Sequence, residues 1–261
     1  MKKFFALLLA AALFLSLAAC AGSSGAQSDL DYIKQKGTLV VGITDFAPMD
    51  YEDENGEWIG FDADMAKAFA ASLGVQVEFQ VIDWDNKVPE LNGKAIDCVW
   101  NGMTLTDEVK SAMETSNAYC NHAQVVIVKA DVADQYQSVE SLSELTFAVE
   151  SGSAGKAMAE EYGLKYIEVL DQATALLEVK SGTADAAIID ALMAGAMVGE
   201  GTDYADLTYT ISLNSEEYGV GFRKGSDLAA ALNDYFKAAY ADGSLQACAD
   251  QYGIQAALIA Q

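Results

Sequence analysis

The chain has 261 residues, of which 52% are hydrophobic and only two are proline. This length and composition suit one large domain or two modest ones with a sizeable core, and they argue against a disordered chain. Thirty-nine acidic residues against 15 basic ones give a formal net charge of −24 at pH 7. Nucleic acid is therefore a poor partner, and the charge at most favours a cationic or zwitterionic small molecule.

The amino terminus has the layout of a secretory signal. Lys2 and Lys3 precede an apolar run over residues 4–17, which is too short to span a membrane well. The following Leu17-Ala18-Ala19-Cys20 resembles the bacterial lipobox, in which cleavage leaves the cysteine as a lipid-modified first residue. We therefore predict a lipoprotein signal peptide over residues 1–19 and lipidation at Cys20. An ordinary signal peptide with an incidental cysteine is the alternative.

Residues 20–28 are small and polar without an apolar period, which predicts a flexible tether. No later segment is long and apolar enough to span a membrane. The expected location is outside the cytoplasm, anchored to the cell membrane by lipid, so whatever the protein binds must be handed on.

The cysteines after the signal are Cys98, Cys120 and Cys248, and the sequence contains one histidine, His122. These spacings fit no zinc or redox motif, so we expect neither a metal site nor a cofactor. An oxidising exterior permits one disulfide, but three thiols leave one over. We interpret them mainly as small buried apolar residues.

The first core strand is predicted over residues 38–43, a β-branched run that ends in Thr44-Asp45-Phe46. Residues 49–59 then predict a hairpin with its turn at Glu54-Asn55-Gly56. Most of the carboxylates between Asp45 and Asp64 suit a solvated face. Asp45 is the one that we place in a ligand cleft.

The next segments predict a helix and an edge strand. Phe61, Met65, Phe69 and Leu73 share one helix face, closed by Gly74. Residues 75–81 alternate apolar and polar side chains, as in a strand towards a sheet edge. Trp84 follows, where it either caps the core or forms a flat wall for a ligand.

Residues 96–110 predict a short buried strand, a polar turn and a helix that starts at Asp107. Asn101, Gly102 and Thr104 fall in that turn. A helix that starts beyond the carboxyl end of a strand points free N–H groups at the crevice where ligands bind. An ordinary strand-turn-helix connection remains the alternative.

A similar unit recurs later in the chain. Residues 90–97 end a helix at Gly93 and start a strand at Asp97, and residues 179–185 end a helix at Gly182 and lead into a strand that starts at Ala186. Asn101 and Asp190 close these two strands, so two α/β units would each offer polar groups to one cleft. The loop before the helix near 154–161 includes Ser153, whose hydroxyl can help to hold a carboxylate.

The remaining elements complete a two-lobed plan. Strands are predicted at 124–128, 146–149, 166–169, 186–189 and 218–222, with the first and last crossing between lobes antiparallel and side by side. Helices are predicted near 154–161, 172–180, 191–199, 226–240 and 244–252. Lobe 1 comprises residues 29–125 and 219–261, and lobe 2 comprises residues 126–218.

Several short motifs in order resemble the polar-amino-acid family (family 3) of extracellular solute-binding proteins that feed ABC importers. They span about residues 29–254 and include Gly60-Phe61-Asp62-Ala63-Asp64, Asn101-Gly102-Met103-Thr104, Asp185-Ala186-Ala187-Ile188-Ile189-Asp190 and Tyr218-Gly219-Val220-Gly221-Phe222. The resemblance implies an α/β, two-lobed periplasmic-binding-protein-like fold (type II) that closes over one small molecule, with two mostly parallel sheets joined by hinge strands.

The resemblance also implies roles for individual residues. Phe46 and Trp84 match aromatic positions, Gly102 and Thr104 match positions that bind the substrate carboxylate, Ser153 matches a hydroxyl of the second lobe, and Asp190 matches the carboxylate that takes the ammonium. The family usually has an arginine where this chain has Val109. Either N–H groups of helix ends hold the carboxylate, or the ligand is not an ordinary α-amino acid.

The expected function is capture of a small polar solute, an amino acid or a related zwitterion or cation, and delivery to ABC permease subunits. We expect a monomer with no catalytic residues. A sensory or scavenging lipoprotein without a transporter is one alternative. An extracellular dehydratase-like enzyme is another, in which Asp45 and Asp190 would be the candidate acid–base groups.

Overall fold

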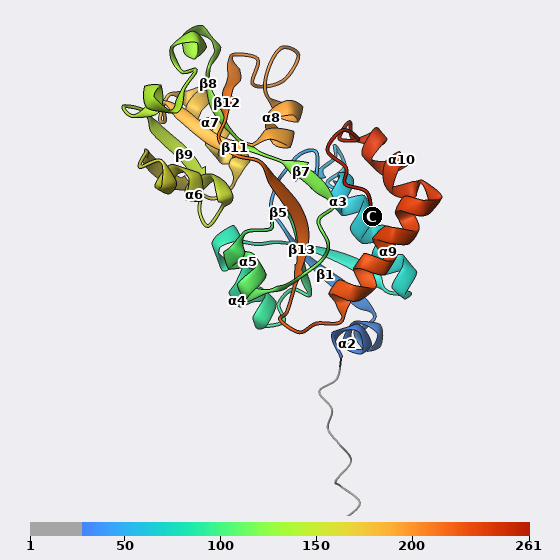
Figure 1. Ribbon diagram of the computed structural model, residues 1–261. Helices are drawn as coiled ribbons and strands as arrows, with labels where there is room; N and C mark the ends of the chain where they lie inside the picture. Colours follow the sequence, from blue (N-terminus) through green and yellow to red (C-terminus); the bar gives the residue numbers. More distant parts are fainter. Residues whose placement is uncertain (1–27) are drawn as a thin grey trace, which may run out of the picture.

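The protein folds into two lobes, each built around its own β-sheet, in a computed structural model that describes residues 28–261 (Figure 1). The predicted signal peptide, Cys20 and nearly all of the predicted tether lie outside the described residues. The type II two-lobed α/β fold expected from the sequence is confirmed.

Lobe 1 contains a sheet with the strand order β4-β1-β5-β13-β6, and β7 pairs with β13 beside this path. β1, β4 and β5 are mutually parallel, whereas β13 is antiparallel to β5. The carboxyl ends of the parallel strands therefore meet at one edge, where open α/β sheets bind ligands. The strands are β1 (Thr38–Ile43), β4 (Gln76–Val81), β5 (Cys98–Thr104), β6 (Glu114–Thr115), β7 (Cys120–His122) and β13 (Glu216–Phe222).

The helices of lobe 1 bury the faces that their apolar spacing predicts. Phe61, Met65 and Phe69 of α3 are buried in the core, and the edge position expected for β4 is confirmed. Figure 1 shows α10 and α9 beside α3, on the side of the sheet away from α4 and α5. These helices are α2 (Asp29–Lys36), α3 (Phe61–Leu73), α4 (Lys87–Asn92), α5 (Asp107–Ala112), α9 (Leu228–Asp242) and α10 (Ser244–Gln251), with the short helix η2 (Trp84–Asn86) before α4.

A small hairpin follows β1, as the Asn55-Gly56 turn signal predicts. β2 (Tyr51–Glu52) and β3 (Trp58–Ile59) pair antiparallel. Asp53 stabilises the turn, because its carboxylate accepts the N–H groups of Asn55 and Glu57 at 2.8 and 2.9 Å.

Lobe 2 contains a five-stranded sheet with the order β10-β9-β11-β8-β12. β9 is parallel to both β10 and β11, whereas β8 is antiparallel to β11. The predicted strands and helices are present as β8 (Gln124–Lys129), β9 (Thr146–Glu150), α6 (Ala154–Glu161), β10 (Lys165–Val169), α7 (Gln172–Ser181), β11 (Ala186–Asp190) and α8 (Ala191–Met197). The structure adds three elements that were not predicted, η3 (Ala130–Gln135), η4 (Val139–Leu142) and β12 (Leu207–Ser212).

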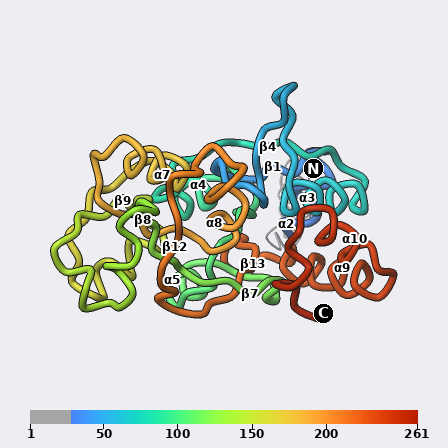
Figure 2. Tube along the Cα trace, turned by 90° about the horizontal axis from the view of Figure 1, so that it is seen from above, coloured from blue at the N-terminus to red at the C-terminus, as the bar shows by residue number. Residues whose placement is uncertain are grey.

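The prediction that residues 124–128 and 218–222 pair with each other is wrong. β8 pairs with β11 and β12 in lobe 2, while β13 pairs with β5, β6 and β7 in lobe 1. The crossing chains instead meet where Glu216–Tyr218 lies opposite Cys120–His122. Each apolar strand stays in the sheet of its own lobe because its buried side chains belong to that core. Figure 2 views the molecule from above, where lobe 2 overlaps α4 and α5 of lobe 1 and where β7 and β13 run between lobe 2 and the helices α9 and α10.

The predicted polar turn after residue 100 is also wrong, because β5 continues as a strand to Thr104 and pairs with β13. Its polar side chains stay in the strand because they have partners inside lobe 1. The predicted start of the next helix at Asp107 is confirmed, with Thr106 as its N-cap accepting the Val109 N–H at 3.1 Å.

The three thiols of the described chain are free, with Cys98 and Cys120 buried and Cys248 half-buried. Within residues 28–261 no helix is both long and apolar enough to cross a membrane. The same residues hold no group of three or more His, Cys, Asp and Glu side chains that is arranged to bind a metal ion.

Two carboxyls buried in lobe 1 predict how stability depends on pH. Burial raises the pKa of Asp62 to about 7 and that of Asp50 well above its ordinary value. The folded state therefore binds more protons than the unfolded chain from about pH 4 upward, so the free energy of unfolding falls as the pH rises to about 7. Asp62→Asn is expected to flatten this slope in urea unfolding measured from pH 4 to 7.

Asp53→Asn is the matched control, because Asp53 is exposed and the N–H groups of Glu57 and Asn55 lower its pKa. Its titration lies below this range, so the slope from pH 4 to 7 should stay that of the unaltered protein. An unchanged slope in Asp62→Asn would exclude Asp62 as the titrating group.

Candidate functional site

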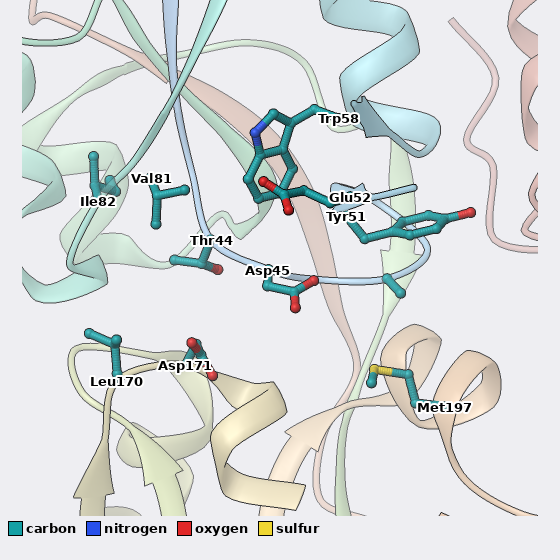
Figure 3. Close-up of a pocket in the computed structure, with 11 residues that line it drawn as sticks. Thr44, Asp45, Tyr51, Glu52, Trp58, Val81, Ile82, Leu170, Asp171 and Met197 are labelled. Atoms are coloured by element: carbon teal, nitrogen blue, oxygen red, sulfur yellow. The ribbon is translucent and has the colours of Figure 1, made fainter. Parts of the chain in front are cut away.

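The loops after β1, β4 and β10 and the β2–β3 hairpin enclose a cavity of about 470 Å³ between the lobes. We call it the acidic cavity. Figure 3 shows Asp45 on the upper side of this space and Leu170 and Asp171 on the lower side. Its lining consists of Thr44, Asp45, Ala47, Tyr51, Glu52, Trp58, Val81 and Ile82 from lobe 1 and Leu170, Asp171 and Met197 from lobe 2.

The acidic cavity carries one sign of charge. Asp45, Glu52 and Asp171 line it, and among residues 28–261 no lysine, arginine or histidine does. Burial, together with the negative charges of Asp171 and Glu52, raises the pKa of Asp45. A bound cation would relieve this repulsion, and the flat rings of Trp58 and Tyr51 offer faces to which cations are attracted.

A second cavity of about 700 Å³ also has walls from both lobes. Lobe 1 contributes Trp84, Lys87, Thr104 and Val109, and lobe 2 contributes residues 152–154 and part of α6. At its wall the lobes touch, since Lys87 Nζ donates to the carbonyl oxygen of Gly152 at 3.0 Å. Gly152 has φ 68°, and a Cβ there would lie only 2.7 Å from Asp85. This close contact accounts for a glycine at position 152.

The predicted site residues divide into three groups. Asp45 lines the acidic cavity; Trp84, Thr104 and Ser153 line the second cavity; Phe46, Asn101, Gly102 and Asp190 line neither. The structure thus brings half of the predicted set to the space between the lobes. Ser153 also serves as the N-cap of α6, accepting the Lys156 N–H at 3.1 Å.

Asn101 and Gly102 have their polar groups occupied inside lobe 1. The Asn101 side-chain oxygen accepts from the N–H and hydroxyl of Thr44, and its nitrogen donates to Asp50 Oδ2 at 2.8 Å. The Gly102 N–H donates to Asp62 Oδ2 at 2.7 Å. Phe46 is buried and packs edge-on against Tyr218, with its ring over Gly102. Ligand contact by these three residues stays a prediction.

Asp190 ends β11 with its carboxylate nearly fully buried. Oδ1 accepts the Leu192 N–H at 2.7 Å, and Oδ2 lies 2.5 Å from Nδ1 of His122. The sequence interpretation gave His122 no role. Its position two residues before the predicted crossing strand at 124–128 was the available signal, because an imidazole there can form an ion pair with a carboxylate.

The most important residues that the sequence interpretation missed are Glu52, Trp58 and Asp171. Glu52 and Trp58 lie opposite each other on the predicted hairpin. Glu52 was assigned with most of its neighbouring carboxylates to a solvated face, and Trp58 was given no role. Asp171 follows β10 and N-caps α7, accepting the Thr174 N–H at 2.7 Å. A polar residue beyond the carboxyl end of a parallel strand was the signal that could have identified it.

Glu150 is a further buried carboxyl at the end of a parallel strand, β9. Burial and then the negative charge of Asp171 raise its pKa to about 8. With this pKa the Glu150 carboxyl is mostly protonated at pH 7, so it adds little negative charge to this end of lobe 2.

Val109 occupies the position at which the resemblance implies an arginine, and it lines the second cavity. It is only 7% exposed and lies in an apolar cluster with Trp84 and Met103. Val109→Arg tests where the ligand's carboxylate lies: it should tighten binding of L-arginine by about tenfold relative to agmatine, which lacks the carboxylate, only if that carboxylate reaches the second cavity, where a guanidinium would form two charge-assisted bonds with it. Calorimetry with both ligands measures the ratio of the two affinities. Equal changes in the affinities for L-arginine and agmatine would show that the ligand's carboxylate does not approach residue 109.

Comparisons with known proteins agree with the two-lobed fold. A family model described as bacterial extracellular solute-binding proteins, family 3, matches residues 39–255. The arginine-binding extracellular protein ArtP of Bacillus subtilis (strain 168) is 32% identical over 254 residues, which cover 94% of this chain and 96% of ArtP. A crystal structure of a mutant of ArgBP from T. maritima matches with a TM-score of 0.81 and 34% identity, covering 86% of this chain and 99% of that chain.

One relative is an enzyme. Cyclohexadienyl dehydratase of Pseudomonas aeruginosa is 28% identical over 200 residues, which cover 74% of each chain.

Proposed function

The chain belongs to family 3 of the bacterial extracellular solute-binding proteins, and on this premise we propose that it captures one small cationic amino acid or related amine between its lobes. One observation carries the proposal. The cavity between the lobes presents Asp45, Glu52 and Asp171 and, within the described chain, no basic side chain. A guanidinium or ammonium group is the ligand chemistry that such a site favours.

The size and walls of the acidic cavity support the same class of ligand. Its volume of about 470 Å³ suits a molecule of amino-acid size. Trp58 adds an aromatic face for a cation. ArtP and ArgBP are named for binding arginine, and the net charge of −24 would draw a cation from a distance.

Carboxylates on both lobes mean that a bound cation would hold the lobes together. Val81 of lobe 1 and Leu170 of lobe 2, each 60% exposed, also line this cavity. Closure over the ligand would remove such apolar side chains from water and add to the affinity.

We propose that the protein is a lipid-anchored monomer outside the cell and that it delivers its ligand to an ABC permease. This role follows from the family, from the predicted lipobox at Cys20 and from a folded body that must pass its ligand on. A sensory role without a transporter is the alternative, and stimulation of a permease's ATP hydrolysis by the loaded protein separates the two.

A dehydratase-like activity is the second candidate function, because one relative is an enzyme. The raised pKa of Asp45 and of Glu150 gives it candidate proton donors. Mass balance on the ligand after incubation tests it, since a binding protein returns its ligand unchanged.

The proposed ligand class is tested by a thermal-shift screen with L-arginine, L-lysine, L-glutamine and L-glutamate. A ligand present at 100 times its dissociation constant adds about 2.7 kcal/mol to the free energy of unfolding. We expect the two cationic amino acids to raise the melting temperature and the other two to leave it unchanged. Stabilisation by L-glutamate alone would exclude a cationic ligand.

A further inference from the structure

The second cavity differs from the acidic cavity in the charges that it offers. Lys87 and Lys156 line it, whereas no basic side chain of residues 28–261 lines the acidic cavity. A cationic amino acid carries a carboxylate as well as its distal cation, and the acidic cavity would repel that carboxylate. Four acids also line the second cavity, but all are exposed and their charges are solvated: Asp85, Asp107, Glu108 and Glu160.

The two cavities are neighbours on both lobes. In lobe 1, Ile82 lines the acidic cavity, and Trp84, two residues further on, lines the second. In lobe 2, β9 and β10 pair in parallel, so the loops that follow them leave the sheet at the same edge. The first loop brings residues 152–153 to the second cavity, and the other brings residues 170–171 to the acidic cavity (Figure 3). One ligand between the lobes can therefore present different groups to the two cavities.

Lys87 holds its ammonium group between the lobes. Nζ donates to the carbonyl oxygen of Trp84 in lobe 1 at 3.1 Å and to that of Gly152 in lobe 2 at 3.0 Å. It also lies 5.0 Å from the centroid of the Trp84 ring, within the range of a cation–π contact. An ammonium group has three N–H donors, so one of them is left for a ligand.

The charge of Lys87 is balanced only at a distance. Within the described chain the hydrogen-bond acceptors of Nζ are the two carbonyl oxygens, and both are neutral. Burial lowers the pKa of Lys87, although the acids around it act in the opposite direction: Glu150, Asp85, Glu108 and Asp83. A carboxylate in contact with Nζ would offset the cost of burying this cation.

The other candidates in the second cavity leave this role to Lys87. Lys156 Nζ is already paired with the carboxylate of Glu168 at 3.1 Å. Val109 is apolar, so Lys87 is the one cationic side chain that the described part of lobe 1 contributes to this cavity. On the lobe 2 side, the Ser153 hydroxyl accepts the Lys156 N–H, and its own O–H can still donate to a carboxylate.

We propose that Lys87 is a specificity-determining residue that binds the carboxylate of the ligand between the lobes. The inference rests on the proposed function, in which the distal cation of the same ligand occupies the acidic cavity. The ligand thus bridges the two cavities, with its charges at opposite ends. An amine that lacks the carboxylate is the poorer ligand.

Calorimetry with L-arginine and agmatine, which lacks only the carboxylate, tests this at physiological ionic strength. The unaltered protein is expected to prefer L-arginine by about 10- to 100-fold, as for one charge-assisted hydrogen bond. Lys87→Met keeps most of the length of the side chain but removes the ammonium group, and it should lower this preference by about tenfold or more. Lys87→Arg keeps a cation and should retain most of the preference.

Lys156→Met is the matched control, because it makes the same change of charge in the lining of the same cavity. We expect it to keep the preference for L-arginine within about twofold of the unaltered protein, since the exposed pair of Lys156 with Glu168 contributes little. A loss as large as that in Lys87→Met would mean that the ratio reports only the charge of the cavity, and would overturn the proposal.

Equal affinities for L-arginine and agmatine in the unaltered protein would overturn it too, and this result depends on no variant. So would an unchanged preference in Lys87→Met, because Lys87 would then only hold the lobes together through Gly152. Failure of the proposed function looks different: L-arginine would bind no better than L-citrulline, its uncharged isostere. L-citrulline and N-carbamoylputrescine, which lacks only its carboxylate, would then still show whether Lys87 binds a carboxylate.

Discussion

Asp171→Asn is expected to weaken binding of L-arginine by about 10- to 100-fold, because a charge-assisted hydrogen bond is worth about 1.5–3 kcal/mol. Asp171 is the carboxylate that lobe 2 contributes to the acidic cavity. Asparagine is also a good N-cap, so it can keep the bond to the Thr174 N–H and preserve α7. The substitution therefore removes charge and little else. Isothermal titration calorimetry measures the change in affinity.

Asp134→Asn is the matched control. Asp134 is an exposed aspartate of lobe 2 that lines neither cavity, so its variant makes the same change in net charge without touching the site. We expect its affinity to stay within about twofold of the unaltered protein, because charges beyond a Debye length are screened. Equal losses of affinity in both variants would show that the effect comes from net charge alone and that Asp171 does not contact the ligand.

Arg223→Met is expected to lower the free energy of unfolding by about 3–5 kcal/mol, because it breaks a buried ion-pair network. The variant removes the basic partner of Asp29 and one of the two basic partners of Asp97, whose other partner is Lys36. Arg223 is only 8% exposed. Its Nε donates to Asp29 Oδ2 at 3.0 Å, and its Nη1 donates to the Ile96 carbonyl at 2.9 Å. Its Nη2 lies 3.5 Å from the fully buried Asp97. The side chain thus joins α2 and the segment just before β5 to the end of β13.

Urea unfolding measures this loss as a lower midpoint with the same dependence on denaturant. Lys165→Met is the control, because Lys165 and Glu144 form an exposed pair at 3.5 Å whose removal should cost less than about 1 kcal/mol. If Arg223→Met cost no more than Lys165→Met, the network would have no stabilising role.

The sequence predicted elements wherever one segment carries its own signal. The apolar stripe of α3, the alternation of β4 and the Asn55-Gly56 turn each depend on neighbours a few residues apart, and all three are confirmed. The two-lobed plan that joins them came from the order of the predicted elements, and the family resemblance implied the same plan. The pairing of the crossing strands could not be predicted, because two buried apolar strands do not reveal which lobe's sheet each one joins.

The site was harder to predict, because it depends on contacts between distant segments. Asn101 and Gly102 were expected at the ligand, yet their partners Thr44, Asp50 and Asp62 lie 40 to 57 residues away in the sequence. The acidic cavity likewise joins Asp45 and the hairpin to Asp171. Only the folded chain shows that these carboxylates face one space, and that His122 rather than solvent meets Asp190.

The central claim is that a cation is held between the lobes by carboxylates from both. Calorimetric comparison of L-arginine with L-citrulline at pH 7 tests it most directly, because the two differ in the charge of one terminal group. We predict that L-arginine binds about 100-fold or more tightly than L-citrulline, as expected when at least two charge-assisted bonds are lost. Equal affinities, or binding of L-citrulline alone, would contradict the claim.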